Sequence, residues 1–409
     1  MKHSYFNKLL DILRPGARVF AHAGPSESLA LRAALAAEPE RAAGVEFVGV
    51  FLTSVNDFDY AGLHPTARMV SSFTPPQMRA SFETNRFDFT PLHYSELGAW
   101  IRSQRFDLAV LHCPPERDGR FSLGLNADVA LAAAQRARQT AVIVNPNMPW
   151  TRCSGPLDST RVDLRIDGDG PLLSMPADRG DEASDIIADH VAAFVRDSDV
   201  VQTGIGRIPG AVLRKLTARR NLRLHGGMLS DEVVDLARAG ALAPATITTG
   251  QAIGSQILHD FAREADALFC STDETHDPRR LMALDDFVAI NSAIEVDLFG
   301  QVNGEFVNGR QISGVGGSSD FARAARWAKN GRSIVALPAS ARGKSRIVPR
   351  IAGPVSQTRN DADIIVTEHG AAQIRHAGLD ARAEQLIALA APEHRNDLAA
   401  AWRALRAQM

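Results

Sequence analysis

A glycine-rich turn follows an apolar run in the second half of the chain. The residues Gly204-Ile205-Gly206 stand between the run at 199–203 and a helical pattern that begins at Pro209. Glycine lets a backbone approach a ligand closely, and a helix N-terminus offers unpaired N–H groups to an anion. Parallel α/β sheets bind ligands at the carboxyl ends of their strands, so this turn is a candidate ligand site. A tight turn with no ligand would show the same short pattern.

Two further loops combine small residues with possible phosphate-binding groups. The loop that begins at Ser313 contains Gly314, Gly316 and Gly317, followed by small hydroxyl residues. Such loops can form anion-binding nests, although the phosphate-loop pattern is not completed here. The basic loop around Lys344 could pair with phosphate oxygens. The alternatives are a flexible loop for the first and a solvated turn for the second.

Two acids alternate with apolar residues along one segment. Over 294–298, Glu295 and Asp297 occupy every second position. This alternation predicts a strand that exposes both acids on one face, either to solvent or to a cleft.

The elements that position these groups alternate between short β-branched runs and helical stretches. This pattern predicts an α/β protein with mainly parallel sheets flanked by helices. We expect Asn126 to cap the helix that it begins. Strands are expected at 18–22, 45–52, 108–111, 141–144, 199–203, 222–229 and 334–337, and helices at 27–37, 126–138, 183–196 and 209–216.

The second half repeats the first in outline. The order strand, glycine turn, helix at 18–35 recurs at 199–216, which favours two related halves, although two generic βαβ units would also look alike. The stretch 174–182 is rich in Pro, Gly, Asp and Arg and fits an interdomain linker. We therefore predict an N-terminal domain over 1–180 and a C-terminal domain over 181–409 that carries the glycine loops.

Composition sets limits on the class of protein. The chain has 409 residues, is 45% hydrophobic and 22% charged, and has a net charge of −2, so no basic field points to nucleic acid. No run of 18 apolar residues predicts a membrane helix, and 1–14 lacks a secretory pattern. The three cysteines are widely spaced and form no CxxC, and the histidines form no HExxH, so no metal is expected. These features indicate a cytoplasmic protein.

Eight segments in a fixed order resemble the acetyl-CoA hydrolase/transferase family, which includes 4-hydroxybutyrate and acetate CoA-transferases. The resemblance covers nearly the whole chain. The segments are CPPERDGRFSLG from Cys113, VNPNMPWT from Val144, TGIGRIPGAVLRKL from Thr203, LRLHGGMLSDEVVDLARAGAL from Leu222, INSAIEVDLFGQVNGE from Ile290, SGVGGSSDF from Ser313, ALPASARGKSRIVP from Ala336 and VTEHGAAQIR from Val366.

The resemblance implies two related α/β halves, a homodimer, and transfer of coenzyme A from an acyl-CoA to a small carboxylic acid. No cofactor is implied beyond coenzyme A as substrate. In the family, a glutamate attacks the thioester, and backbone N–H groups stabilise the oxyanion. By the resemblance, Ile205 matches a backbone oxyanion donor, Gly316 and Gly317 match the loop over the thioester arm, and Lys344 matches a loop near the CoA phosphates.

The chain departs from the family at the nucleophile. Where the family pattern places the glutamate, this chain reads His225-Gly226-Gly227-Met228, and Gly227 has no side chain that could form an anhydride. The missing side chain would leave room for a carboxylate from elsewhere. Glu27 and Glu295 are the two candidates.

Three interpretations remain open. The chain is a CoA-transferase with a relocated carboxylate, or a hydrolase in which a side chain activates water, or a protein that binds acyl-CoA without turning it over.

Overall fold

The first unit of the structure is built on a parallel sheet. The structure, a computed structural model, describes residues 3–168, 170–175 and 180–409. The seven strands of this sheet are all paired in parallel, and α5 (Ala130–Arg136) packs on two of them. In spatial order the strands are β10 (Leu164–Asp167), β7 (Ala137–Val144), β5 (Phe106–Cys113), β1 (Arg18–Ala21), β2 (Glu46–Val48), β3 (Arg68–Ser71) and β4 (Phe87–Phe89). The other helices of this unit are α1 (His3–Leu10), α2 (Leu29–Ala37), α3 (Arg79–Glu83), α4 (Leu97–Ser103), α9 (Gln256–Glu264) and α10 (Thr272–Thr275).

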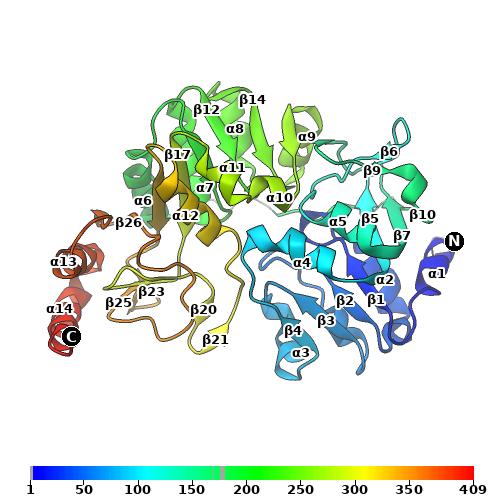
Figure 1. The fold of residues 1–409 in the computed structure, drawn as a ribbon, viewed down its shortest axis with the longest axis horizontal. Helices are drawn as coiled ribbons and strands as arrows, with labels where there is room; N and C mark the ends of the chain where they lie inside the picture. The colour runs from blue at the N-terminus through cyan, green and yellow to red at the C-terminus, as the bar shows by residue number, and fades with distance from the viewer. Residues whose placement is uncertain (1–2, 169, 176–179) are drawn as a thin grey trace. The chain divides into compact units, whose positions relative to one another are not determined.

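The second unit has a sheet of the same kind (Figure 1). In spatial order its strands are β27 (Gly370–Gln373), β26 (Ile364–Thr367), β22 (Arg332–Ala336), β17 (Phe287–Ser292), β11 (Val200–Thr203), β12 (Leu222–His225) and β14 (Leu242–Thr249). Strand β27 runs antiparallel to β26, whereas the strands from β26 through β22, β17 and β11 to β12 pair in parallel. The helices are α6 (Glu182–Ala192), α7 (Arg207–Lys215), α8 (Glu232–Arg238), α11 (Pro278–Met282), α12 (Ser318–Trp327), α13 (Leu379–Leu389) and α14 (Pro392–Arg406).

The two sheets share one topology. Strands β10, β7, β5, β1, β2 and β3 of the first unit follow the same spatial order as β26, β22, β17, β11, β12 and β14 of the second. The repeat expected from sequence pairs β1 with β11, and these two strands hold the same place in this order, as do β2 and β12, and β7 and β22. The prediction of two related α/β halves is therefore confirmed.

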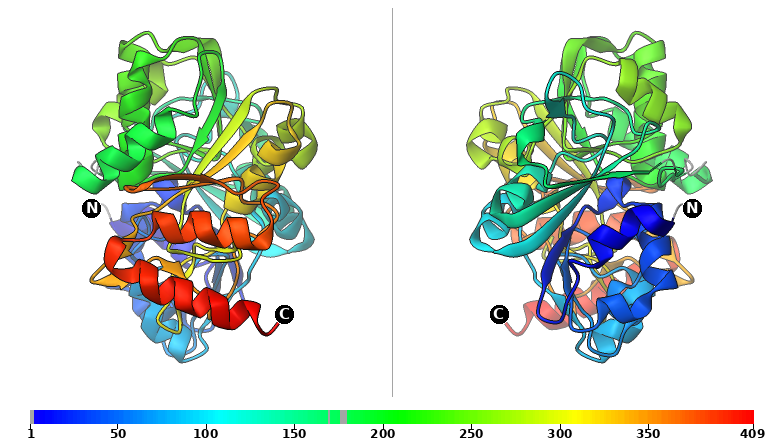
Figure 2. Two further views of the ribbon diagram at one scale, coloured as in Figure 1. Left: turned by 90° about the vertical axis from the view of Figure 1, so that its left-hand side faces the viewer. Right: turned by 90° about the vertical axis from the view of Figure 1, so that its right-hand side faces the viewer.

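Each unit encloses its own apolar core. In the first unit, one cluster of buried residues extends from Phe6 to Ile166 and includes Phe47, Phe51 and Tyr60. In the second unit, separate clusters lie around Val335 and Phe321. Helix α13 packs on β26 and β27, and α14 packs on α13; the left view of Figure 2 shows these two helices in front, near the C-terminus.

Strand β2 is shorter than expected because side chains take over backbone hydrogen bonds. Strand β2 ends at Val48 instead of Leu52, since the Phe51 N–H donates to Ser71 Oγ and the Leu52 N–H donates to Asn56 Oδ1.

The prediction that Asn126 caps a helix is wrong. Helix α5 begins only at Ala130, and its N-cap residue is Val129. The Asn126 side chain instead donates to Ala23 O and accepts from the Asp128 N–H, which forms a turn ahead of the helix.

The boundary between the units is crossed more than once. The chain first passes from one unit to the other between 176 and 177, near the expected cut at 180, but 248–275 and 312–316 return to the first unit. The contacts therefore do not follow one cut, and the domains 1–180 and 181–409 stay a prediction. The expected linker lies partly outside the described residues, and α6 begins after it with Asp181 accepting from the Ser184 N–H at 2.9 Å.

Candidate functional site

Three neighbouring strands of the second unit end beside one another. Val201 of β11 pairs with Leu224 of β12, and Thr203 of β11 pairs with Ile290 of β17. The segments that follow these strands must therefore meet at one edge of the sheet. They are the turn from Gly204, the run from His225 and the loop after Asn291, and this is the edge at which parallel sheets bind ligands.

The glycine turn leaves open space and one available donor. Gly206 has φ +111° and stands directly before α7. No described atom lies within 4 Å of a Cβ built on Gly204 or Gly206. Among the described residues, no group accepts a hydrogen bond from the Ile205 N–H. The turn thus has the space and the donor that an oxyanion site requires.

Two buried amide side chains are hydrogen-bonded to each other at the ends of β11 and β17. Gln202 Nε2 donates to Asn291 Oδ1 at 3.5 Å, and Asn291 Nδ2 donates to Gln202 Oε1 at 3.3 Å. Both residues are buried, so the pair ties the ends of β11 and β17 together. Gly226 lies over it, since a Cβ there would be 3.2 Å from Gln202 Cγ.

Gly227 lies in a bend and not within a strand. The expected strand over 222–229 is interrupted at Gly226-Gly227, between β12 and the short β13 (Met228–Leu229). The backbone of Gly227 is outside the left-handed region, so a side chain there would meet no φ strain.

The space beside Gly227 is already filled, which corrects the expectation that it would be vacant. A Cβ on Gly227 would lie 2.9 Å from Cε1 and 3.2 Å from Nε2 of His276. Burial lowers the pKa of the His276 imidazole to about 3, and nearby His225 adds to the effect. Sequence reasoning missed His276, because no spacing pattern connects it with Gly227.

The glycines of the 313–321 loop are required by packing at two positions. A Cβ on Gly314 would lie 1.9 Å from the Ser72 carbonyl oxygen, and one on Gly317 would lie 2.4 Å from His276 Nε2. Gly316 has φ +59°, a conformation that glycine adopts without cost. Their role in binding coenzyme A stays a prediction.

Glu27 is an internal group of the first unit. Its side chain is completely buried, and its carboxylate accepts from Asn56 Nδ2 at 2.9 Å, Tyr60 Oη at 3.0 Å and Arg32 Nη1 at 3.4 Å. Burial raises the pKa of this carboxyl, against the hydrogen bond from Asn56. Its carboxylate oxygens are therefore already engaged.

The two alternating acids differ in exposure, so the expectation that both are exposed is wrong. Asp297 is fully buried and accepts from the N–H groups of Phe299, Gln301 and Ile351. It organises the loops around it. Glu295, at the start of β18 (Glu295–Asp297), is half-buried, and among the described residues its carboxylate forms no hydrogen bond or ion pair.

Lys344 lies in a short hairpin. It begins β24 (Lys344–Ser345), which pairs with β23 (Ser340–Ala341) across a turn in which Arg342 and Gly343 have positive φ. Lys344 is exposed and free to meet an anion in solution. No contact of the described residues tests its expected role near the CoA phosphates.

Comparison with known proteins identifies the family. The acetyl-CoA hydrolase/transferase N-terminal domain matches residues 2–159, and the C-terminal domain of the same family matches residues 254–402. The 4-hydroxybutyrate coenzyme A transferase of Clostridium kluyveri is 33% identical over 93% of this chain and 92% of its own. The chain belongs to the acetyl-CoA hydrolase/transferase family.

Solved structures agree with this assignment. RipA from Yersinia pestis superposes with a TM-score of 0.91 at 26% identity and covers 99% of both chains. A 4-hydroxybutyrate CoA-transferase from Porphyromonas gingivalis gives a TM-score of 0.80 at 27% identity, over 99% of this chain and 97% of its own. The fold expected from the family resemblance is confirmed.

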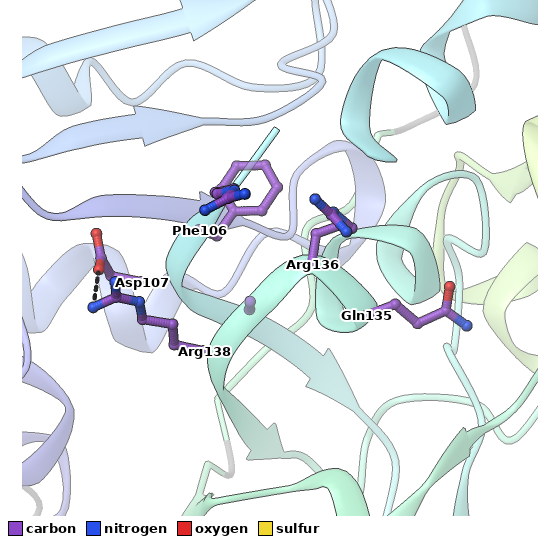
Figure 3. A pocket seen from close by; sticks show the side chains of 7 residues that line it. Phe106, Asp107, Gln135, Arg136 and Arg138 are labelled. Atoms are coloured by element: carbon purple, nitrogen blue, oxygen red, sulfur yellow. Dashed lines mark ion pairs between the residues drawn. The ribbon is translucent and has the colours of Figure 1, made fainter. Parts of the chain in front are cut away.

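The first unit has a hollow at the start of two neighbouring strands. It measures about 480 Å³ and is lined by residues at the start of β5 and β7, among them Phe106, Asp107 and Arg136 (Figure 3). Arg138 pairs with Asp107 at 3.7 Å beside it. Parallel sheets bind ligands at the carboxyl ends of their strands, so a hollow at the start of two strands is not a candidate acyl-CoA site.

The described part of the chain contains neither a candidate metal centre nor a helix that could cross a membrane. No group of three or more His, Cys, Asp or Glu side chains there is placed to hold a metal ion. In the same residues, no helix has the length and apolar character needed to cross a bilayer.

A buried carboxyl in this family member gives a pH-dependent stability. Asp128 is 1% exposed and accepts from Tyr94 Oη at 2.5 Å and from Gln251 Nε2. Burial raises its pKa from 3.8 to about 6, although both hydrogen bonds oppose the shift. The folded state therefore binds a proton more tightly than the unfolded state.

We expect the free energy of unfolding to fall as the pH rises from about 4 to about 6. Asp128 contributes fully to stability at a pH below its pKa in the unfolded state. This contribution, about 3 kcal/mol, is lost as the pH rises through the pKa of Asp128 in the folded state. Urea unfolding at several pH values measures it. In Asp128→Asn, which keeps an acceptor for Tyr94, this part of the slope should disappear. An unchanged slope would assign the effect to other groups.

Proposed function

We propose that this chain is a CoA-transferase that moves coenzyme A between a short-chain acyl-CoA and a carboxylic acid. The proposal rests on the open turn at Gly204–Gly206, in which the Ile205 N–H is available as a donor. This turn lies at the carboxyl ends of the parallel strands of the second sheet. A thioester carbonyl placed in this space would have its developing oxyanion within reach of that donor.

We propose Glu295 as the nucleophile ahead of Glu27. Strand β17 lies next to β11, so the chain from Ile290 onward leaves the same edge as the glycine turn, and Glu295 follows five positions later in the same unit. Its carboxylate is not engaged among the described residues, whereas that of Glu27 accepts three hydrogen bonds. A relocated glutamate would attack the thioester carbonyl and release CoA thiolate. The thiolate would then attack the glutamyl carbonyl of the anhydride and release the first acid.

The neutral imidazole beside Gly227 favours a second candidate, a hydrolase. His276 lies beside Gly227, which the resemblance aligns with the family glutamate, and His225 lies near His276. A histidine can activate water, and water attack would release free CoA without an acceptor.

A single assay separates these functions. The protein is mixed with acetyl-CoA with or without butyrate, and butyryl-CoA and free CoA are measured by chromatography. We expect butyryl-CoA with butyrate and little free CoA without it. Free CoA in both mixtures would support the hydrolase, and unchanged acetyl-CoA in both would contradict both enzymes. The expected homodimer is tested on the same sample by light scattering.

Replacement of the proposed nucleophile is the matching prediction. Glu295→Gln removes the nucleophilic oxygen but keeps size and polarity, so transfer should fall by about 100-fold or more with an unchanged melting temperature. Glu295→Asp should retain part of the rate. If Glu295→Gln transfers at the natural rate, Glu295 is not the nucleophile.

A further inference from the structure

The backbone around His276 is held in one place by the helix that follows it. Asp277 caps α11, its carboxylate accepting from the Arg279 N–H at 2.8 Å, and Pro278 occupies the first helical position. A capped N-terminus with proline in its first turn is a well-defined start. The backbone position of His276 is therefore defined by the sequence that follows it.

The ring of His276 is packed on every side that the structure describes. It is 1% exposed, and its centroid lies 4.5 Å from that of Phe321 in α12. Phe321 in turn contacts Phe287 of β17, with ring centroids 6.3 Å apart. Because the aromatic support extends into the core, the imidazole cannot swing away without disturbing buried rings.

Two glycines lie against this ring. The distances from a built Cβ to the nearest ring atom are 2.9 Å at Gly227 and 2.4 Å at Gly317, both below the closest approach of real Cβ atoms. A Cβ on Gly317 would also lie 2.8 Å from Cε2 of Phe321. Any side chain at either position must displace a ring that is itself buttressed.

We propose that His276 is a specificity-determining residue that closes the nucleophile position of this site, so that Gly227, Gly317 and His276 form one sterically coupled set. The assignment of a nucleophile position here rests on the proposed function, in which acyl-CoA binds at this edge of the sheet. The steric coupling itself rests only on the distances.

The consequence is a site whose chemistry differs from a carboxylate site. The ring is uncharged at neutral pH, because burial lowers the pKa of His276 to about 3. A neutral imidazole thus faces the strand end where the resemblance places an anionic glutamate. An anhydride on residue 227 is excluded while the ring is present, and the attacking group must approach from another element or from water.

Thermal unfolding without ligand tests the coupling. Gly227→Ala adds only a Cβ and should lower the melting temperature by roughly 2–6 °C, because overpacking strains a filled core. In a His276→Ala background the same change should lower it by less than about 1 °C. The matched control is Gly226→Ala, whose Cβ would face Gln202 and not His276, so His276→Ala should not alter its effect. Equal shifts for Gly227→Ala in both backgrounds would overturn the proposal.

Formation of a covalent CoA adduct tests whether His276 closes the nucleophile position. A purely structural role of His276 would not change adduct formation. In the double variant Gly227→Glu/His276→Ala, the introduced carboxylate should attack the thioester carbonyl of an acyl-CoA and form an anhydride. The released CoA thiolate should then attack the glutamyl carbonyl and displace the acid, which leaves CoA bound to the side chain as a thioester. Intact-protein mass spectrometry would show a gain of CoA less one water. Gly227→Glu alone should show no adduct, and an equal adduct there would overturn the closure. If the melting temperatures show the coupling between positions 227 and 276 but the natural protein does not turn over acyl-CoA, the proposed function is refuted. The steric contact of Gly227 and Gly317 with His276 would still hold.

Discussion

A valine at position 204 is expected to reduce acyl-CoA turnover by about 100-fold or more while leaving the fold intact. The backbone of Gly204 is outside the left-handed region, and no described atom lies within 4 Å of a Cβ built there. The substitution should therefore change the free energy of unfolding by less than about 1 kcal/mol. Its branched side chain would occupy the space next to the Ile205 N–H, and misplacement of a reacting group by about 1 Å costs on the order of 100-fold in rate.

The measurement combines steady-state kinetics with calorimetric binding of CoA. Gly378→Val is the matched control, because Gly378 also has open space around its Cβ and an ordinary φ of −64°, but lies before α13. It should leave turnover unchanged. If the Gly204→Val protein binds and turns over acyl-CoA normally, the turn is not part of the acyl-CoA site. Gly316 is less suitable for this test, because its φ of +59° would strain valine whether or not a ligand binds.

Removal of the Glu27 carboxylate is expected to have the largest effect on stability. Glu27→Ala would leave the Tyr60 hydroxyl without its acceptor inside the core of the first unit and would remove one acceptor each from Asn56 and Arg32. Loss of one partner of a buried, hydrogen-bonded charge costs about 3 kcal/mol or more. Glu38→Ala is the control, since Glu38 is a partly exposed acid directly after α2 and should change stability by less than about 0.5 kcal/mol.

Glu27→Gln separates a structural role from a catalytic one. The amide keeps the shape and can accept from Asn56 and Arg32 through its oxygen, so most of the stability should remain. It cannot form an anhydride. We expect acyl-CoA transfer to continue at the same order of magnitude, because we propose Glu295 as the nucleophile. A stable Glu27→Gln protein without transfer would instead identify Glu27 as the nucleophile and contradict the proposal for Glu295.

Much of the architecture could be predicted from local patterns. The strand, glycine turn and helix around Gly204 form the element that the sequence predicts, since a run of β-branched residues and the φ freedom of glycine act over a few neighbouring residues. The repeat of this order at 18–35 predicted two related halves, and the strand orders of both sheets confirm it. The ordered segments likewise indicated the family, because each is a short string that needs no tertiary information.

Burial and contacts between distant segments could not be predicted in this way. Asp297 alternates with apolar residues as an exposed strand acid would, yet three backbone N–H groups enclose it, one of them from Ile351. Gly227 has no side chain, but the sequence did not show that the space beside it is filled. Its neighbour His276 is separated from it by several elements of the chain, and hydrophobic periodicity carries no information on which ring packs against which backbone. Local sequence was therefore enough for the fold, its internal repeat and the open glycine turn, whereas the packing of the whole unit decided that an imidazole fills the space beside Gly227.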